Sequence, residues 1–75
     1  MKKIPRTDKR FLDKMQELNR TAGMTYSRLA ERMRAKGFQI THLQLFAIAD
    51  RRVTADRKTQ DAIAEILGCL RKDIF

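Results

Sequence analysis

Side chains suited to recognition chemistry gather in the middle of the chain. Thr41, His42 and Gln44 offer a hydroxyl, an imidazole and an amide, and a run of apolar residues leads from them to Arg51 and Arg52. A glutamine amide can bond bidentately to adenine, and a guanidinium pairs with phosphate in a forked geometry. This mixture favours recognition of a polyanion that displays hydrogen-bonding edges.

The same residue types argue against catalysis and against a metal centre. The chain has one histidine, His42, and no Ser, Cys or carboxylate stands at a suggestive spacing from it. No glycine-rich phosphate loop is present. The single Cys69 lies far from His42 in sequence, and two such ligands are too few to hold zinc. We therefore expect that the protein is not an enzyme and that it binds no metal ion or cofactor.

Charge and length narrow the class of partner. The 75 residues are enough for one domain, and 17 Lys and Arg against 9 Asp and Glu give a net charge of +8. Such an excess creates a positive potential that attracts phosphate backbones. No apolar run approaches the roughly 20 residues of a membrane span, and no apolar leader segment follows Met1. We therefore expect a cytoplasmic, nucleoid-associated protein with no membrane partner.

Apolar residues recur at helical spacing, and capping residues divide them into segments. No strand-like alternation appears, so the fold class predicted is all-α, with four to five short helices. Residues 1–6 are expected to form a basic N-terminal arm ahead of a domain at 7–75. The helices expected are one capped by Thr7 or Asp8 and ending at Ala22, 26–36 capped by Thr25, 42–49 capped by Thr41, one capped by Thr54 or Asp56 and ending at Leu67, and a last turn within 70–75.

The second and third predicted helices have the layout of a helix-turn-helix. Two helices that cross closely need a small residue at the contact, and Ala30 stands there. The segment Met24–Met33, with Thr25, three variable residues and then Leu29-Ala30-Glu31, resembles the lambda-repressor/Cro-like family. The segment 62–69, followed by 73–75, is similar to that family's last helix and closing turn. The resemblance covers about residues 10–75 and implies a lambda-repressor-like, DNA-binding fold.

Two departures from the family pattern leave the third helix open to two registers. The segment 34–39 makes the second helix and its turn about three residues longer than the commonest form, and Asp50-Arg51 stands where the family usually has glycine. In the register favoured here, Thr41 caps the helix, and Leu45 and Ile48 point inward. The exposed start is then His42, Gln44 and Ala47, with Leu43 and Phe46 to one side. In the other register the helix starts at Gln39, and Leu43 and Phe46 point inward.

Each site residue receives a role from its chemistry and place. The predicted base contacts in a major groove are Thr41, His42, Gln44 and Ala47, within a recognition helix at about 41–49. The predicted phosphate contacts are Tyr26, Ser27 and Arg28 at a helix start, Arg51 and Arg52 after the recognition helix, Arg57 and Lys58 at a later helix start, and Lys2, Lys3 and Arg6 in the arm. Alternatives remain for several: Ala47 can be plain helix filler, and Arg51 and Arg52 can simply complement a helix dipole.

These observations predict a sequence-specific regulator of transcription that binds double-stranded DNA. A homodimer on DNA is expected, because one short helix contacts too few bases for a tight site. The competing hypothesis is a protein-interaction module of a regulatory complex, since the third helix is unusually apolar. In either register, one of its two apolar pairs lies near the surface, and exposed apolar patches usually mark binding surfaces.

Overall fold

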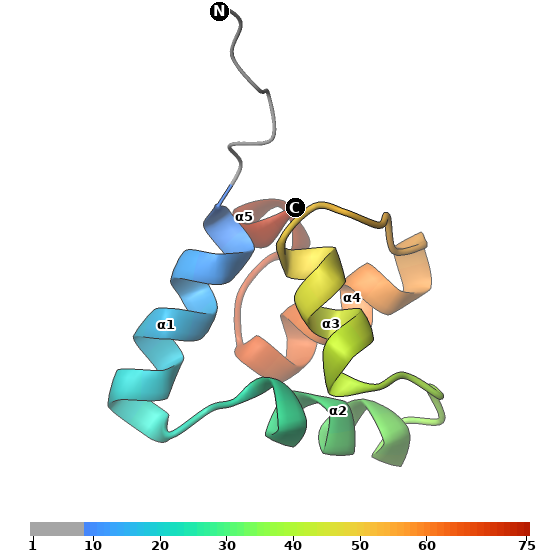
Figure 1. Ribbon diagram of the computed structural model, residues 1–75, viewed down its shortest axis with the longest axis horizontal. Helices are drawn as coiled ribbons and strands as arrows, with labels where there is room; N and C mark the ends of the chain where they lie inside the picture. Colours follow the sequence, from blue (N-terminus) through green and yellow to red (C-terminus); the bar gives the residue numbers. More distant parts are fainter. Residues whose placement is uncertain (1–8) are drawn as a thin grey trace, which may run out of the picture.

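The computed structural model describes residues 9–75, and within that range the chain forms five helices and no strand. The helices are α1 (Arg10–Ala22), α2 (Tyr26–Ala35), α3 (His42–Ala49), α4 (Arg57–Leu67) and α5 (Arg71–Ile74), arranged around one core (Figure 1). The all-α prediction of four to five short helices is confirmed. The arm residues Lys2, Lys3 and Arg6 and the cap candidates Thr7 and Asp8 lie outside the described residues.

Capping side chains set where three of the helices begin. Thr25 accepts a hydrogen bond from the backbone N–H of Arg28 at 3.1 Å, and Asp56 accepts one from Thr59 at 3.0 Å. Thr41 caps α3 in the same way. Each bond satisfies a backbone donor that the helix leaves without an internal partner. Between Thr54 and Asp56, the structure therefore selects Asp56.

The ends of α1 to α4 share one backbone device, a residue in the left-handed region just past the helix. Glycine fills the position after three of them, at Gly23, Gly37 and Gly68. After α3 the position belongs to Arg51, with φ 62°, and the next N–H, that of Arg52, donates to the carbonyl of Ala47 at 2.9 Å. Arg51 thus adopts a backbone conformation that glycine usually takes, at a cost in folding free energy of about 1–2 kcal/mol.

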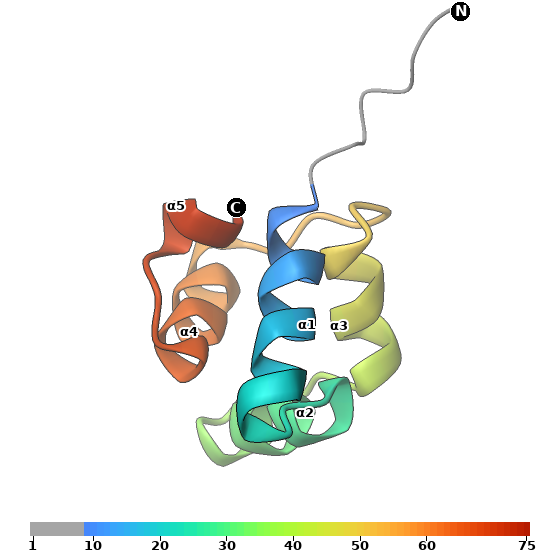
Figure 2. The same ribbon diagram turned by 90° about the vertical axis from the view of Figure 1, so that its left-hand side faces the viewer.

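Apolar faces of all five helices meet in the core. Its largest fully buried side chains are Phe11, Leu29, Met33, Leu45, Ile63 and Ile74. Helix α2 packs on α3 and α4, and α5 packs on α1 and α4. In Figure 2, α1 stands between α3 and the α4–α5 pair. Ala30 is 2% exposed on α2, as a close helix crossing requires. Ala22, the predicted last residue of the first helix, ends α1 and is exposed.

The register of α3 is the one with Thr41 as cap. Leu45 and Ile48 are buried, whereas Leu43 is 69% exposed and Phe46 41% exposed. The alternative, with a helix starting at Gln39, is wrong. Its failure has a local cause: the turn after α2 closes with Phe38 donating to the Met33 carbonyl at 3.0 Å, so the chain leaves that turn extended and reaches helical geometry only after Thr41.

Candidate nucleic-acid interface

Two reciprocal hydrogen bonds fix the start of α3. The backbone N–H of Gln44 donates to Thr41 Oγ1 at 3.2 Å, and the backbone N–H of Thr41 donates to Gln44 Oε1 at 2.9 Å. Both side chains are exposed, as is His42. A glutamine amide carries two donors and a second acceptor lone pair besides the one used here. Gln44 can therefore hold the helix start and still offer an amide to a ligand. Sequence reasoning missed this double role, although the spacing of Thr41 and Gln44 is the sequence pattern of a capping box.

The side chain that points most directly away from the core on α3 is Leu43. A helix turns by about 100° per residue, and the buried Leu45, Ile48 and Ala49 define its inward side. Leu43 lies opposite that side, with Phe46 and the half-buried Ala47 flanking it. Sequence reasoning placed Leu43 to one side of the exposed start and so missed it. The signal was present, because the same helical rotation applied to the favoured register gives this order.

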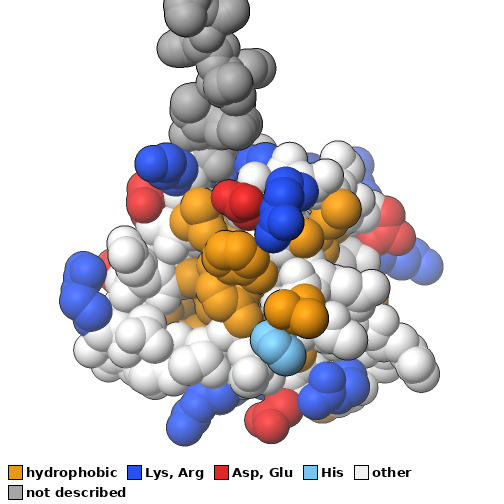
Figure 3. Space-filling view, in the orientation of Figure 1, with side chains coloured by type: hydrophobic (Ala, Val, Ile, Leu, Met, Phe, Trp, Pro, Cys, Tyr) orange, Lys and Arg blue, Asp and Glu red, His pale blue; other side chains and the backbone are white. Residues whose placement is uncertain are grey.

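Two side chains, Tyr26 and Arg52, hold Phe46 in place on this surface. The Tyr26 ring meets it edge-on with centroids 5.5 Å apart, and the Arg52 guanidinium lies 5.8 Å from its ring centre. Arg52 in turn pairs with Asp50 at 3.1 Å. Figure 3 shows orange apolar side chains gathered at the centre of this face beside the pale-blue histidine, with one basic and one acidic side chain directly above them and further charged side chains of both signs around the border. We call the set Leu43, Phe46 and Ala47 the apolar surface of α3.

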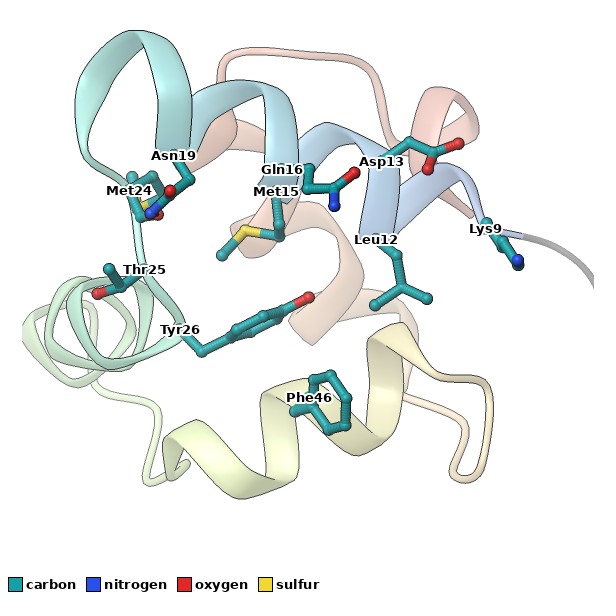
Figure 4. A pocket seen from close by; sticks show the side chains of 10 residues that line it. All are labelled: Lys9, Leu12, Asp13, Met15, Gln16, Asn19, Met24, Thr25, Tyr26 and Phe46. Atoms are coloured by element: carbon teal, nitrogen blue, oxygen red, sulfur yellow. The ribbon is translucent and has the colours of Figure 1, made fainter.

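Tyr26 links this surface to the groove between α1 and α3. Burial raises the pKa of its phenol, and the nearby Asp50 carboxylate raises it further. The groove has a volume of about 570 Å³, with Leu12, Met15 and Phe46 among the side chains that line it. Figure 4 shows the Tyr26 ring lying across the space between the two helices, with Phe46 below it and Leu12 at one end. The phenol of Tyr26 therefore stays protonated to a higher pH than that of an exposed tyrosine.

Four of the predicted phosphate contacts, at the start of α2 and just after α3, divide into two groups. Ser27, Arg28 and Arg52 are exposed near α3, at the start of α2 and in the loop after α3. Arg51 instead turns toward α5, where its Nη2 donates to the Ile74 carbonyl at 2.6 Å and its guanidinium lies 5.3 Å from the Phe75 ring centre. A contact between Arg51 and phosphate stays a prediction. The two contacts in the structure join the loop after α3 to the end of α5.

The start of α4 borders α3 on the side of Gln44. A hollow of about 400 Å³ lies between them and is lined by Gln44 and Ala47 on one side and Asp56 on the other. Hydrogen bonds from Thr59 lower the pKa of the Asp56 carboxyl, so it is ionised and already caps the helix. Arg57 and Lys58 are exposed in the first turn. Because Asp56 occupies the helix end, a phosphate would have to bind these two side chains rather than the free N–H groups.

Two other kinds of site are not found in residues 9–75. No group of three or more potential metal-ligating side chains occurs there. None of the helices in this part of the chain is long and apolar enough to cross a membrane.

Comparison of the chain with models of protein families, with curated proteins and with solved structures finds no match. What is established is a small, compact all-α domain of five helices over residues 9–75.

Proposed function

We propose that the chain is a sequence-specific double-stranded-DNA-binding regulator of the lambda-repressor/Cro-like helix-turn-helix kind, with the start of α3 in the major groove. The observation that carries the proposal is the exposure of the first turn of α3, from Thr41 to Gln44, on a helix packed against α2. A helix is about 10–12 Å across with its side chains, and the major groove is about 12 Å wide.

Charge around α2 and α3 supports a polyanionic partner. Residues 26–52 contain six Lys and Arg, at Arg28, Arg32, Arg34, Lys36, Arg51 and Arg52, against two acidic residues. Arg28 and Arg52 are exposed at the start of α2 and in the loop after α3, where they can contact a duplex backbone beside an inserted α3. Binding as a homodimer supplies a second half-site, since α3 has only 8 residues.

Selection of bound sequences from random duplex DNA tests this proposal. We expect a defined consensus, arranged as an inverted repeat if the protein binds as a homodimer. Affinity should fall steeply with salt, with a log–log slope of about −5 for about six phosphate contacts. Failure to enrich any sequence, or absence of duplex binding at low salt, would refute the proposal.

Two variants separate base contact from backbone contact. Gln44→Glu keeps the acceptor for the Thr41 N–H but removes the amide donors, so it should lose preference at a base pair while the fold stays intact. Arg52→Ala should weaken binding to all sequences about equally and make the salt slope shallower by about 1. Lys72→Ala is the matched control, because Lys72 belongs to α5, which packs on α1 and α4 and lies apart from the first turn of α3 (Figure 2).

The second candidate function is a protein-interaction module, favoured by the 69% exposure of Leu43 and the 41% exposure of Phe46. A partner bound in this way would stay associated after nuclease treatment of a lysate. It would be released by Phe46→Asp in a protein whose helical circular dichroism is unchanged, and Phe46→Leu would retain it. Loss of the partner on nuclease treatment would contradict this candidate.

A further inference from the structure

The polar side chains predicted to contact bases do not occupy the outermost position of α3. Thr41 and Gln44 cap each other, and the helical rotation places Gln44 roughly a quarter turn from the outward direction. The outward direction belongs to Leu43, flanked by Phe46 and Ala47. A groove that receives α3 therefore meets an aliphatic side chain at the centre of the contact.

Only one group in the major groove, the C5-methyl group of thymine, makes a favourable contact with an aliphatic side chain such as Leu43. Base edges there present nitrogen and oxygen donors and acceptors, which an apolar residue cannot satisfy, and the C5-methyl group of thymine. Covering a donor or acceptor without a hydrogen bond is unfavourable, whereas covering a methyl group removes apolar surface from water. Leu43 thus discriminates by favouring thymine and by disfavouring an unmethylated edge.

The surroundings of Leu43 suit a duplex better than an apolar protein partner. Phe46 is held by Tyr26 at 5.5 Å and by Arg52 at 5.8 Å, so its ring is fixed next to a cation able to face a phosphate. A phenylalanine contributes about 150–250 Å² of contact area. A stable protein interface needs about 800 Å² from each partner. The apolar surface of α3 is narrow, and the exposed Arg52 lies at its edge beside Phe46.

We infer that α3 recognises its site chiefly through thymine methyl groups, with Leu43 as the central specificity-determining residue and Phe46 beside it. This inference rests on the proposed function, because it names the feature of duplex DNA that the same surface selects.

Replacing thymine by uracil tests the inference directly, since uracil keeps every hydrogen-bonding group and lacks only the methyl. The probe is the duplex obtained by selection, synthesised with uracil at one thymine position at a time. We expect a loss of about fourfold in affinity for each contacted methyl group, confined to the few positions under α3. In Leu43→Ala, the thymine and uracil duplexes should bind equally at the position that Leu43 contacts, and Leu43→Met should restore the difference.

The control variant is Leu70→Ala, because Leu70 is 61% exposed and precedes α5, away from α3. It should preserve the full uracil effect. Equal affinity for all uracil duplexes, with sequence-selective binding intact, overturns the inference and leaves the proposed function standing. Absence of any sequence-selective duplex binding overturns both. A protein dimer in sedimentation that dissociates in Leu43→Ala, with no uracil effect, assigns the surface to protein contact and also overturns the inference.

Discussion

Replacing Arg51 compares two opposing effects at one position. The residue holds a left-handed backbone conformation, with φ 62°, that glycine adopts without strain. Its guanidinium also donates to the Ile74 carbonyl at 2.6 Å and lies over the Phe75 ring. Arg51→Gly relieves the backbone and removes both contacts, whereas Arg51→Ala removes the contacts and keeps the strain.

The magnitudes favour the arginine. A hydrogen bond from a charged donor contributes about 1.5–3 kcal/mol, and the cation–π contact adds about 0.5–1 kcal/mol. Arg51 is half-exposed, so the lower end of each range applies, and losing both contacts lowers the free energy of unfolding by about 2 kcal/mol. Relief of left-handed strain returns about 1–2 kcal/mol, but glycine's greater freedom in the unfolded chain offsets about 0.5–1 kcal/mol of that. We expect Arg51→Gly to be less stable by about 1 kcal/mol and Arg51→Ala by about 2 kcal/mol.

Thermal unfolding followed by circular dichroism measures the difference. For a domain of this size, 1 kcal/mol shifts Tm by about 4–8 °C, so the order of Tm should be wild type, then Arg51→Gly, then Arg51→Ala. DNA affinity at a temperature where all three are folded should change little. An Arg51→Gly variant that is as stable as wild type but has weaker binding and a shallower salt slope would refute the reasoning, and would support the predicted contact of Arg51 with phosphate.

Three further results are expected. Thr41→Ala and Thr25→Ala should each lower the free energy of unfolding in urea by about 1 kcal/mol, because each removes the cap of a helix. Thr41→Ser keeps the capping hydroxyl and should unfold at the wild-type midpoint. An unchanged midpoint for Thr41→Ala would contradict the register of α3. The raised pKa of Tyr26 means that the folded state holds this proton more tightly than the unfolded chain, so wild type should lose stability as pH rises above about 10. Tyr26→Phe should lose less, and identical pH dependence of the two proteins would be evidence against burial of the phenol. Burial also raises the pKa of the Cys69 thiol, so a disulfide reagent at pH 8 should react more slowly with native protein than with protein in urea, and equal rates would contradict the half-buried position.

Helix bounds were predictable because their determinants are local. Thr25 and Thr41 cap α2 and α3 as the sequence suggested, and the predicted span of α3 is matched by the structure. Gly23 and Gly68 mark the ends of α1 and α4 for the same reason, since few other residues accept a left-handed backbone. Helix caps and left-handed helix ends depend on residues that are neighbours in the chain, so they can be predicted from one sequence.

The remaining features depend on contacts that neighbouring residues do not specify. Arg51 takes the conformation usual for glycine where α3 ends, and its contacts with the Ile74 carbonyl and the Phe75 ring, both distant in sequence, offset the cost. The ring of Phe46 stays partly exposed because Tyr26 and Arg52 hold it there rather than in the core. Residue types predicted that α3 has a surplus of apolar side chains, but only the packing decides which of them is left outside.

The contacts of Arg10 have a practical consequence for surface-based measurements. Its guanidinium donates to the carbonyls of Lys72 and Phe75 at 2.8 and 2.6 Å, which brings the start of α1 and the end of α5 together. In Figure 1 both lie at one end of the molecule, and the first turn of α3 lies at the other. A biotin or affinity tag attached after Phe75 would therefore tether the protein by the end remote from Thr41 and leave the exposed first turn of α3 facing the solution.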